Sequence, residues 1–161
     1  MILTAHAYAG FLNKSKACNR VGAHIFISEN NPNPKLNGPV LTIAQIIKYV
    51  IASAAEAEIA ALYITDKNMV PLQNNIIEMG WPQLKSPIQI DNSKAVGFTN
   101  KTIIKKATKS ADRKLWWLRD PESQYQFRSY WAPGYDNERD HITKNNPPIY
   151  HVANRSNPYL V

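Results

Sequence analysis

The sequence predicts one α/β domain, built from a mixed five-stranded sheet with helices packed against it. Strand-like and helix-like segments follow one another in the order β-β-β-α-β-α-α-β-α, which is typical of such a domain. The 161 residues are enough to bury a core, and they contain neither an internal repeat nor a linker. No apolar run reaches the roughly 18–20 residues of a membrane span, so we expect no contact with a membrane.

The first three strands are expected at residues 2–9, 21–28 and 39–52. The second strand alternates between inward apolar residues and outward residues, as a half-buried strand does. A loop must precede the third strand, because residues 29–38 contain two prolines and four asparagines. The third strand is rich in β-branched residues, although residues 46–50 also fit a helix.

A long helix is expected to begin after Ser53, because Ser53 and Glu56 have the spacing of a capping box. Pro71 is expected either to kink this helix or to start a second segment that ends at Gly80. The remaining predicted elements are a strand at 86–91, helices at 92–98 and 108–120, a strand at 125–131 and a helix at 136–144. Residues 1–144 would then form the domain, and residues 145–161, rich in proline and asparagine, an extended tail.

The cysteine content excludes an internal disulfide and a cysteine zinc site, because Cys18 is the single cysteine. A reducing, intracellular setting, cytoplasmic or nuclear, is therefore expected. The segment that begins at Met1 lacks the positively charged region of a secretory signal, so nothing indicates that the protein is secreted. We expect the isolated domain to be monomeric.

Positive charge is concentrated in one part of the chain. Residues 101–119 hold seven Lys and Arg and one acid, Asp112, so seven minus one, or +6, of the formal net charge of +7 lies there. Clustered basic side chains bind phosphate backbones by releasing counterions, which predicts a nucleic-acid partner. A solvated helix face is the alternative. The candidate nucleic-acid-binding residues are Lys101, Lys105, Lys106, Lys109, Arg113 and Lys114.

Three acidic residues are candidate catalytic and metal-binding groups. Glu58 is expected at the edge of the buried stripe of its helix, where a carboxylate needs a cation or hydrogen-bond donors. Asp91 ends an apolar strand, where ligands collect in α/β domains, although it could equally cap the next helix. Asp140, in the last predicted helix, is weak evidence alone. Carboxylates drawn from distant points of one domain are what a two-magnesium phosphodiester hydrolase needs.

Four segments in this order resemble the ribonuclease H domain at the C-terminal end of copia-type LTR retrotransposon Pol polyproteins, which also carry the reverse transcriptase. They are SAAEAEIAAL, PIQIDNSKAVG, TKSADRKLWWLRD and WAPGYDNERDHITK, and the last is similar to the family's ending W-x-P-G-x-x-N-x-x-D-x-x-T-K. The likeness covers essentially the whole chain. It implies a ribonuclease H-like fold whose first three strands are antiparallel, and hydrolysis of RNA in RNA–DNA hybrids with two Mg²⁺ ions. It also implies that Glu58, Asp91 and Asp140 match three of the family's four metal carboxylates.

Tyr8 is the departure from the family pattern. The first strand of the family carries H-S-D-A, whereas this chain has His6, Ala7, Tyr8 and Ala9. By the resemblance, Tyr8 stands in place of the aspartate that bridges both metal ions. A phenol has an ordinary pKa of about 10, so it stays neutral at pH 7, and it is bulkier than a carboxylate. It therefore ligates Mg²⁺ poorly and leaves little room for it.

Two hypotheses follow from this substitution. In the first, the chain is a working ribonuclease H in which another ligand, such as His6, compensates for the missing aspartate. In the second, it is a decayed or repurposed copy that keeps the fold and at most binds nucleic acid. The chain starts at Met1 with no polymerase before it, as expected of an isolated fragment, which favours the second hypothesis. Under either, Tyr8, Glu58 and Asp91 should converge.

Overall fold

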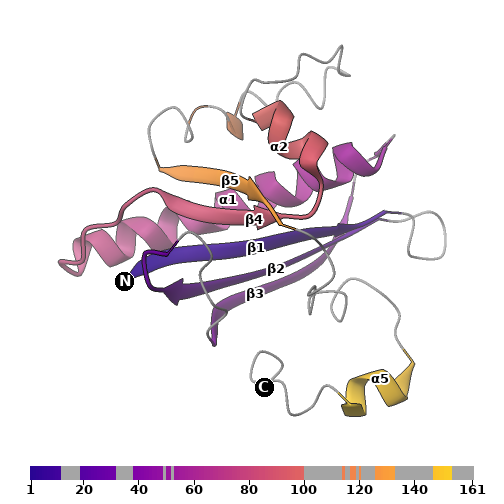
Figure 1. The fold of residues 1–161 in the computed structure, drawn as a ribbon, viewed down its shortest axis with the longest axis horizontal. Coiled ribbons are helices and arrows are strands. Elements are labelled where there is room, and N and C mark those ends of the chain that lie inside the picture. The colour runs from indigo at the N-terminus through magenta and orange to yellow at the C-terminus, as the bar shows by residue number, and fades with distance from the viewer. Residues whose placement is uncertain are drawn as a thin grey trace.

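The computed structural model shows a five-stranded sheet with helices against it (Figure 1). The strand order is β3-β2-β1-β4-β5. The pairs β1–β2 and β2–β3 are antiparallel, whereas β1–β4 and β4–β5 are parallel, which confirms the predicted mixed sheet. The structure describes residues 1–11, 19–31, 38–48, 50–51, 53–99, 114, 117–118, 120, 126–132 and 147–153.

The first three strands form an antiparallel meander with β3 at one edge of the sheet. Strand β1 spans Ile2–Gly10, β2 spans Asn19–Ser28 and β3 spans Pro39–Ile47. The third strand ends five residues before the expected position 52. Ile47 pairs with Asn19, the first residue of β2, so β3 ends where its only neighbour in the sheet begins. Val50, beyond this point, is 97% exposed.

The other half of the sheet is shorter. Strand β4 spans Ser86–Ile90 and β5, the second edge, spans Phe127–Trp131. Both begin or end within two residues of the expected positions. Ile88 and Ile90 are fully buried, and they share the face of the sheet that carries Ala5 of β1. The short strand expected at 86–91 is therefore an inner strand, paired with β1 on one side and with β5 on the other.

Helix α1 spans Ala54–Glu78 and begins as the capping signal predicted. The hydroxyl of Ser53 accepts a hydrogen bond of 3.2 Å from the backbone N–H of Glu56. Pro71 does not divide the helix, which runs through it as one element. Pro71 and Lys67, the residue whose carbonyl loses its helical partner, are both exposed, so water can satisfy that carbonyl. Gly80 follows the helix with φ of 89°, a left-handed conformation that suits glycine.

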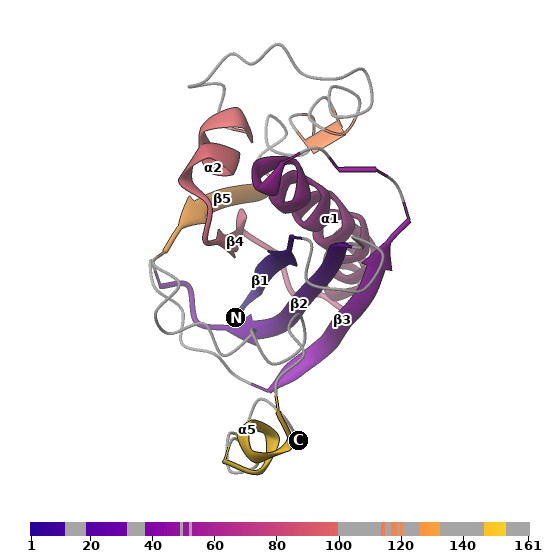
Figure 2. The same cartoon turned by 90° about the vertical axis from the view of Figure 1, so that its right-hand side faces the viewer.

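Helices α1 and α2 cover one face of the sheet, as Figure 2 shows. Helix α2 spans Ser93–Thr99. The core lies between α1 and the strands, where small side chains of β1 allow close approach of the helix. It includes Ala5, Ala7, Ile59, Leu62 and Met69, all at most 2% exposed. Burial of this apolar surface is the main source of stability for the described fold.

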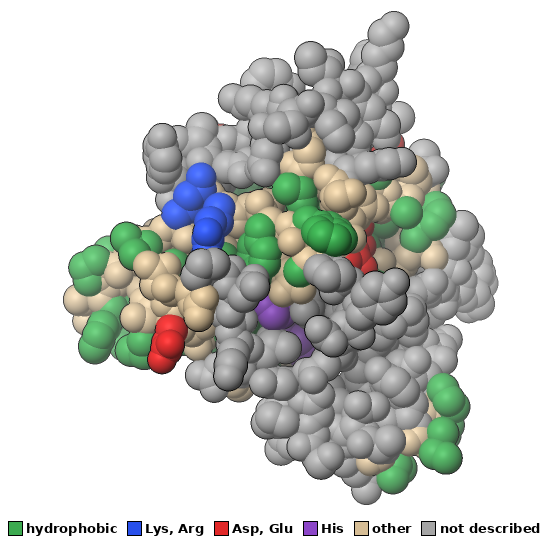
Figure 3. All heavy atoms as spheres, in the orientation of Figure 1, with side chains coloured by type: hydrophobic (Ala, Val, Ile, Leu, Met, Phe, Trp, Pro, Cys, Tyr) green, Lys and Arg blue, Asp and Glu red, His purple; other side chains and the backbone are tan. Residues whose placement is uncertain are grey.

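An exposed apolar cluster lies at the end of α1, where Figure 3 shows hydrophobic side chains at the left of the molecule. It consists of Ile77, Met79, Trp81 and Leu84. The side chain of Gln83 fastens this segment to the start of β1, because its Oε1 accepts a 2.9 Å hydrogen bond from the N–H of Leu3. No helix in the described part of the chain is long and apolar enough to span a membrane.

The C-terminal region differs in part from the expected extended tail. Helix α5 spans Pro148–Ala153, so these residues are helical rather than extended. A proline is favourable in the first turn of a helix, and residues 149–153 contain no further proline. The domain boundary at 144 and the helix expected at 136–144 lie outside the described residues. Of the helix expected at 108–120, the structure describes four positions, all helical.

Candidate functional site at the end of β1 and β4

The strand ends that carry Tyr8 and Asp91 lie side by side. Strands β1 and β4 are parallel, with Ala5 opposite Ile88 and His6 opposite Gln89. Continuing this register by two residues brings Tyr8 level with Asp91, the residue directly after β4. The ends of these two neighbouring parallel strands therefore meet at one edge, which is where α/β sheets bind ligands.

Glu58 reaches the same edge from the first turns of α1. Its Oε1 accepts a 2.9 Å hydrogen bond from the backbone N–H of Ala9, the residue after Tyr8. Glu58 is 4% exposed, whereas its neighbour Glu56 is only half-buried. A carboxylate buried to this extent needs such a donor, because desolvation disfavours its charged form. Glu58 thus contacts the backbone next to Tyr8, at the edge of the sheet where β4 leads into Asp91.

Asp91 does not cap helix α2, which was its alternative role. The cap is Asn92, whose Oδ1 accepts a hydrogen bond of 3.3 Å from the N–H of Ala95. The carbonyl of Asp91 instead accepts a 3.0 Å hydrogen bond from the indole N–H of Trp131 at the end of β5. Asp91 is therefore fixed by its backbone to the strand side of the turn, with helix α2 beginning two residues later, at Ser93.

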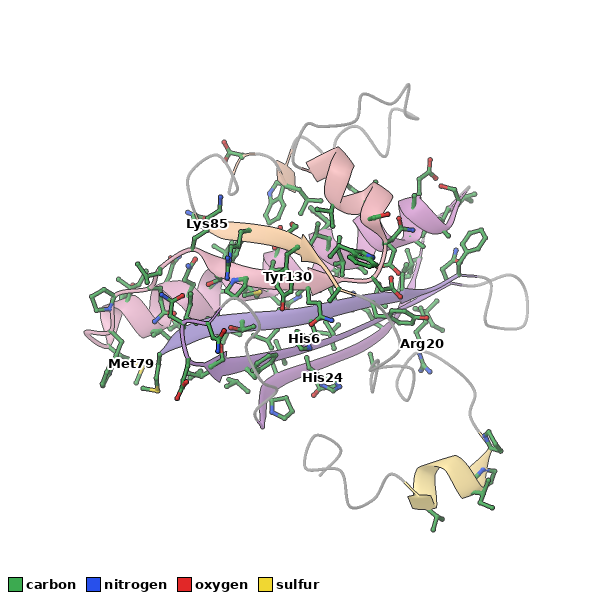
Figure 4. The ribbon with its side chains drawn as sticks, viewed as in Figure 1. His6, Arg20, His24, Met79, Lys85 and Tyr130 are labelled. Atoms are coloured by element: carbon green, nitrogen blue, oxygen red, sulfur yellow. The ribbon has the colours of Figure 1, made fainter. Side chains whose placement is uncertain are left out.

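His6 belongs to a polar row that crosses the whole sheet on the face away from α1 (Figure 4). Paired positions in successive strands place Thr42, His24, His6, Gln89 and Tyr130 in this row. His24 Nδ1 lies 3.1 Å from the hydroxyl of Thr42, and the hydroxyl of Tyr130 donates to Oε1 of Gln89 over 3.4 Å. His6 itself is 3% exposed. This is the setting of a structural histidine.

The family's metal ions require more ligands than the described residues provide. Glu58 and Asp91 are the carboxylates at this edge, and Tyr8 contributes a neutral phenol. No group of three or more His, Cys, Asp and Glu side chains that could hold a metal ion occurs among the described residues. Glu58 also already accepts the N–H of Ala9. These residues alone do not fit a site for two Mg²⁺ ions, which prefer several hard oxygen ligands each.

Several predicted site residues lie outside the described residues. They are Asp140, Lys101, Lys105, Lys106, Lys109 and Arg113. Lys114 is described, as a half-buried helical residue. The roles proposed for all of them stay predictions.

The sequence analysis missed Arg20, a residue of β2 at this edge. It is paired with Gly10, two residues after Tyr8 on β1. Arg20 lies one residue before the strand expected at 21–28, so both its place in β2 and its closeness to Tyr8 depend on the cross-strand register. That register is not readable from the segment itself.

No family model and no curated protein matches this chain. Solved structures of ribonuclease H domains do match it. RNase H1 isolated from compost by a metagenomic approach has a TM-score of 0.65 at 11% identity, over 88% of this chain and 92% of that protein. RNase H1 from Halobacterium salinarum NRC-1 has a TM-score of 0.60 at 16% identity, over 89% and 95%.

A retroviral domain is also similar. The RNase H domain of prototype foamy virus has a TM-score of 0.52 at 12% identity, over 88% of each chain. The compost enzyme has a further structure in complex with an RNA/DNA hybrid, with a TM-score of 0.63. At these identities the likeness establishes the fold, and this chain has a ribonuclease H-like fold.

Proposed function

We propose that this chain is a ribonuclease H domain derived from a copia-type retrotransposon, which binds RNA–DNA hybrids and whose hydrolysis of the RNA strand is impaired at Tyr8. One observation carries the proposal. Tyr8 lies level with Asp91, and Glu58 is hydrogen-bonded to the next residue, Ala9, so position 8 neighbours both predicted carboxylate ligands.

The impairment follows from the chemistry of this position. Metal-dependent phosphodiester hydrolysis uses paired cations to hold the attacking and the leaving oxygen. A neutral phenol at position 8, in place of a carboxylate, removes a negative charge from the place where such cations need it. The geometry gives no support to His6 as a substitute. It lies three residues before Ala9, about 10 Å along a strand, and it is buried in the polar row.

Hybrid binding is supported by charge and by fold. Of the net charge of +7, +6 lies in residues 101–119, as expected of a surface that binds phosphates. A protein of the same fold has been solved in complex with an RNA/DNA hybrid. The alternative function, a catalytically inactive nucleic-acid-binding module, rests on the same two observations and differs only in whether any cleavage remains.

The test is to restore the missing carboxylate by Tyr8→Asp. We expect the natural chain to cleave an RNA–DNA hybrid in Mg²⁺ weakly or not at all, and Tyr8→Asp to gain on the order of a thousandfold in rate. Tyr8→Asn is the matched control, because it has the size of aspartate without its charge and should gain nothing. Adding Glu58→Gln to Tyr8→Asp should abolish the gained activity.

Two outcomes would change the assignment. Brisk cleavage by the natural chain that Glu58→Gln abolishes would show that Tyr8 does not impair it. If Tyr8→Asp binds the hybrid and folds but does not cut it, the inactive binding module is the better description.

A further inference from the structure

Arg20 places a positive charge beside Tyr8. In the antiparallel pair β1–β2, Tyr8 is opposite Gly22 and Gly10 is opposite Arg20. Because side chains alternate along a strand, Arg20 and Tyr8 share one face, the face away from α1. Figure 4 labels Arg20, near the right-hand end of the sheet. They are diagonal neighbours, about 7–8 Å apart and within reach of long side chains. Gly22 has no side chain to stand between them.

The guanidinium of Arg20 lacks a partner within the described residues. Its Nε is buried, and no described residue forms a hydrogen bond with that atom. No described carboxylate forms an ion pair with Arg20 either. A buried donor without an acceptor is unfavourable, more so when it is charged. An anion within reach of the guanidinium would offset this.

On the β2 side of Tyr8 the charged group is Arg20, which favours an anion over a cation. An aspartate at position 8 would be a natural ion-pair partner for Arg20, whereas Tyr8 offers it no negative charge. The guanidinium of Arg20 repels a divalent cation and attracts a phosphate.

We propose that Arg20 binds a phosphodiester group of the nucleic-acid backbone directly, at the sheet edge next to Tyr8 and without a metal ion. A guanidinium suits this ligand, because its planar fork of N–H donors matches two phosphate oxygens at once. This site rests on the proposed function, because the RNA–DNA hybrid supplies the phosphate that Arg20 binds. The proposal goes beyond the proposed function, because it assigns an anion to this edge of the sheet, where the resemblance implies cations.

The first experiment measures binding of a fluorescently labelled RNA–DNA hybrid in EDTA over a range of salt concentrations. Arg20→Gln should weaken binding about 10- to 100-fold and lower the salt slope of the affinity by about one phosphate contact. Arg20→Lys keeps the charge but loses the fork, so it should retain the slope with an intermediate affinity.

Arg128→Gln is the matched control. Arg128 pairs with Pro87, four residues before Asp91, so it lies about 13 Å back along the strands on the same face. Arg128→Gln removes the same charge from the same face, and it should change the salt slope of hybrid binding much less than Arg20→Gln does. If both substitutions change the salt slope equally, Arg20 contributes only to the net charge and the proposal is overturned. An unchanged salt slope in Arg20→Gln would also overturn it.

The second experiment separates this proposal from the proposed function. The Nε–H resonance of Arg20, assigned by its absence in Arg20→Lys, is followed during titration with inorganic phosphate and with the hybrid. We expect a shift with both. If only phosphate shifts it and the hybrid does not bind, the anion site stands and nucleic-acid binding falls. If the hybrid binds without moving this resonance, nucleic-acid binding stands and the site is wrong. If neither ligand moves it, the site is also wrong.

Discussion

Glu58 is expected to stabilise the fold as well as to belong to the candidate site, and its replacement by alanine tests this. Glu58→Ala removes the acceptor of the Ala9 N–H, an atom at the junction of α1 and β1. A charge-assisted hydrogen bond contributes about 1.5–3 kcal/mol, and a buried donor left without an acceptor costs about 1–3 kcal/mol. Part of this loss is offset, because a buried carboxylate no longer has to be desolvated. We expect a net loss of about 2 kcal/mol.

The matched variants make this number interpretable. Glu58→Gln keeps an oxygen in the place of Oε1 and should lose less than about 1 kcal/mol, which also makes it the suitable inactivating substitution in the cleavage assay. Glu56→Ala removes the neighbouring, half-buried carboxylate, and its cost should stay within about 1 kcal/mol.

The measurement is urea unfolding, followed by circular dichroism, with the m-value compared between variants. For a chain of this length, 2 kcal/mol corresponds to a fall in Tm of about 4–8 °C. If Glu58→Ala is as stable as the natural chain, or more stable than Glu58→Gln, the hydrogen bond to Ala9 does not hold α1 to β1. Glu58 would then be a carboxylate kept in place at the expense of stability.

Two further predictions concern helix α2 and the basic stretch. Asn92→Ala should destabilise the protein by about 1 kcal/mol, because it removes the acceptor of the Ala95 N–H, and thermal unfolding would show it. An unchanged Tm would mean that Asn92 does not cap α2. Neutralising Lys105, Lys106 and Lys109 together should flatten the salt dependence of hybrid binding, measured by anisotropy, and an unchanged dependence would make this stretch a solvated face.

Local signals predicted the elements of the sheet well, because each depended on neighbours in sequence. The alternation of β2 predicted a strand, and the Ser53–Glu56 spacing predicted the start of a helix. Neither prediction depended on contacts with distant residues. Pro71 was predicted either to kink its helix or to start a second segment, since a proline removes one hydrogen bond wherever it stands. Its cost depends on whether water reaches the freed carbonyl, and that depends on which side of α1 packs on the sheet.

The site needed information that the local sequence does not contain. Asp91 and Asn92 are both good caps, and the choice between them is made by β5. The N–H of Ala132 donates to the carbonyl of Ile90, and the indole of Trp131 to that of Asp91, which keeps Asp91 with the strand. Arg20 was missed for a similar reason, since only pairing with β1 sets its place beside Tyr8.

The unequal pairing of β1 with its two neighbours has a consequence for how the molecule opens. Strand β1 is paired with β2 at nine positions but with β4 at two, Ala5–Ile88 and His6–Gln89. The β1–β3 meander is built from contacts between chain neighbours, whereas β4 follows α1 in the chain and β5 follows α2. Partial unfolding should therefore separate β4 and β5 first, and their amide hydrogens should exchange with solvent sooner than those of β1 and β2. Tyr8, on β1, and Asp91, directly after β4, lie on opposite sides of the boundary between these two strands. The candidate site can thus come apart, and reform, while most of the protein remains folded.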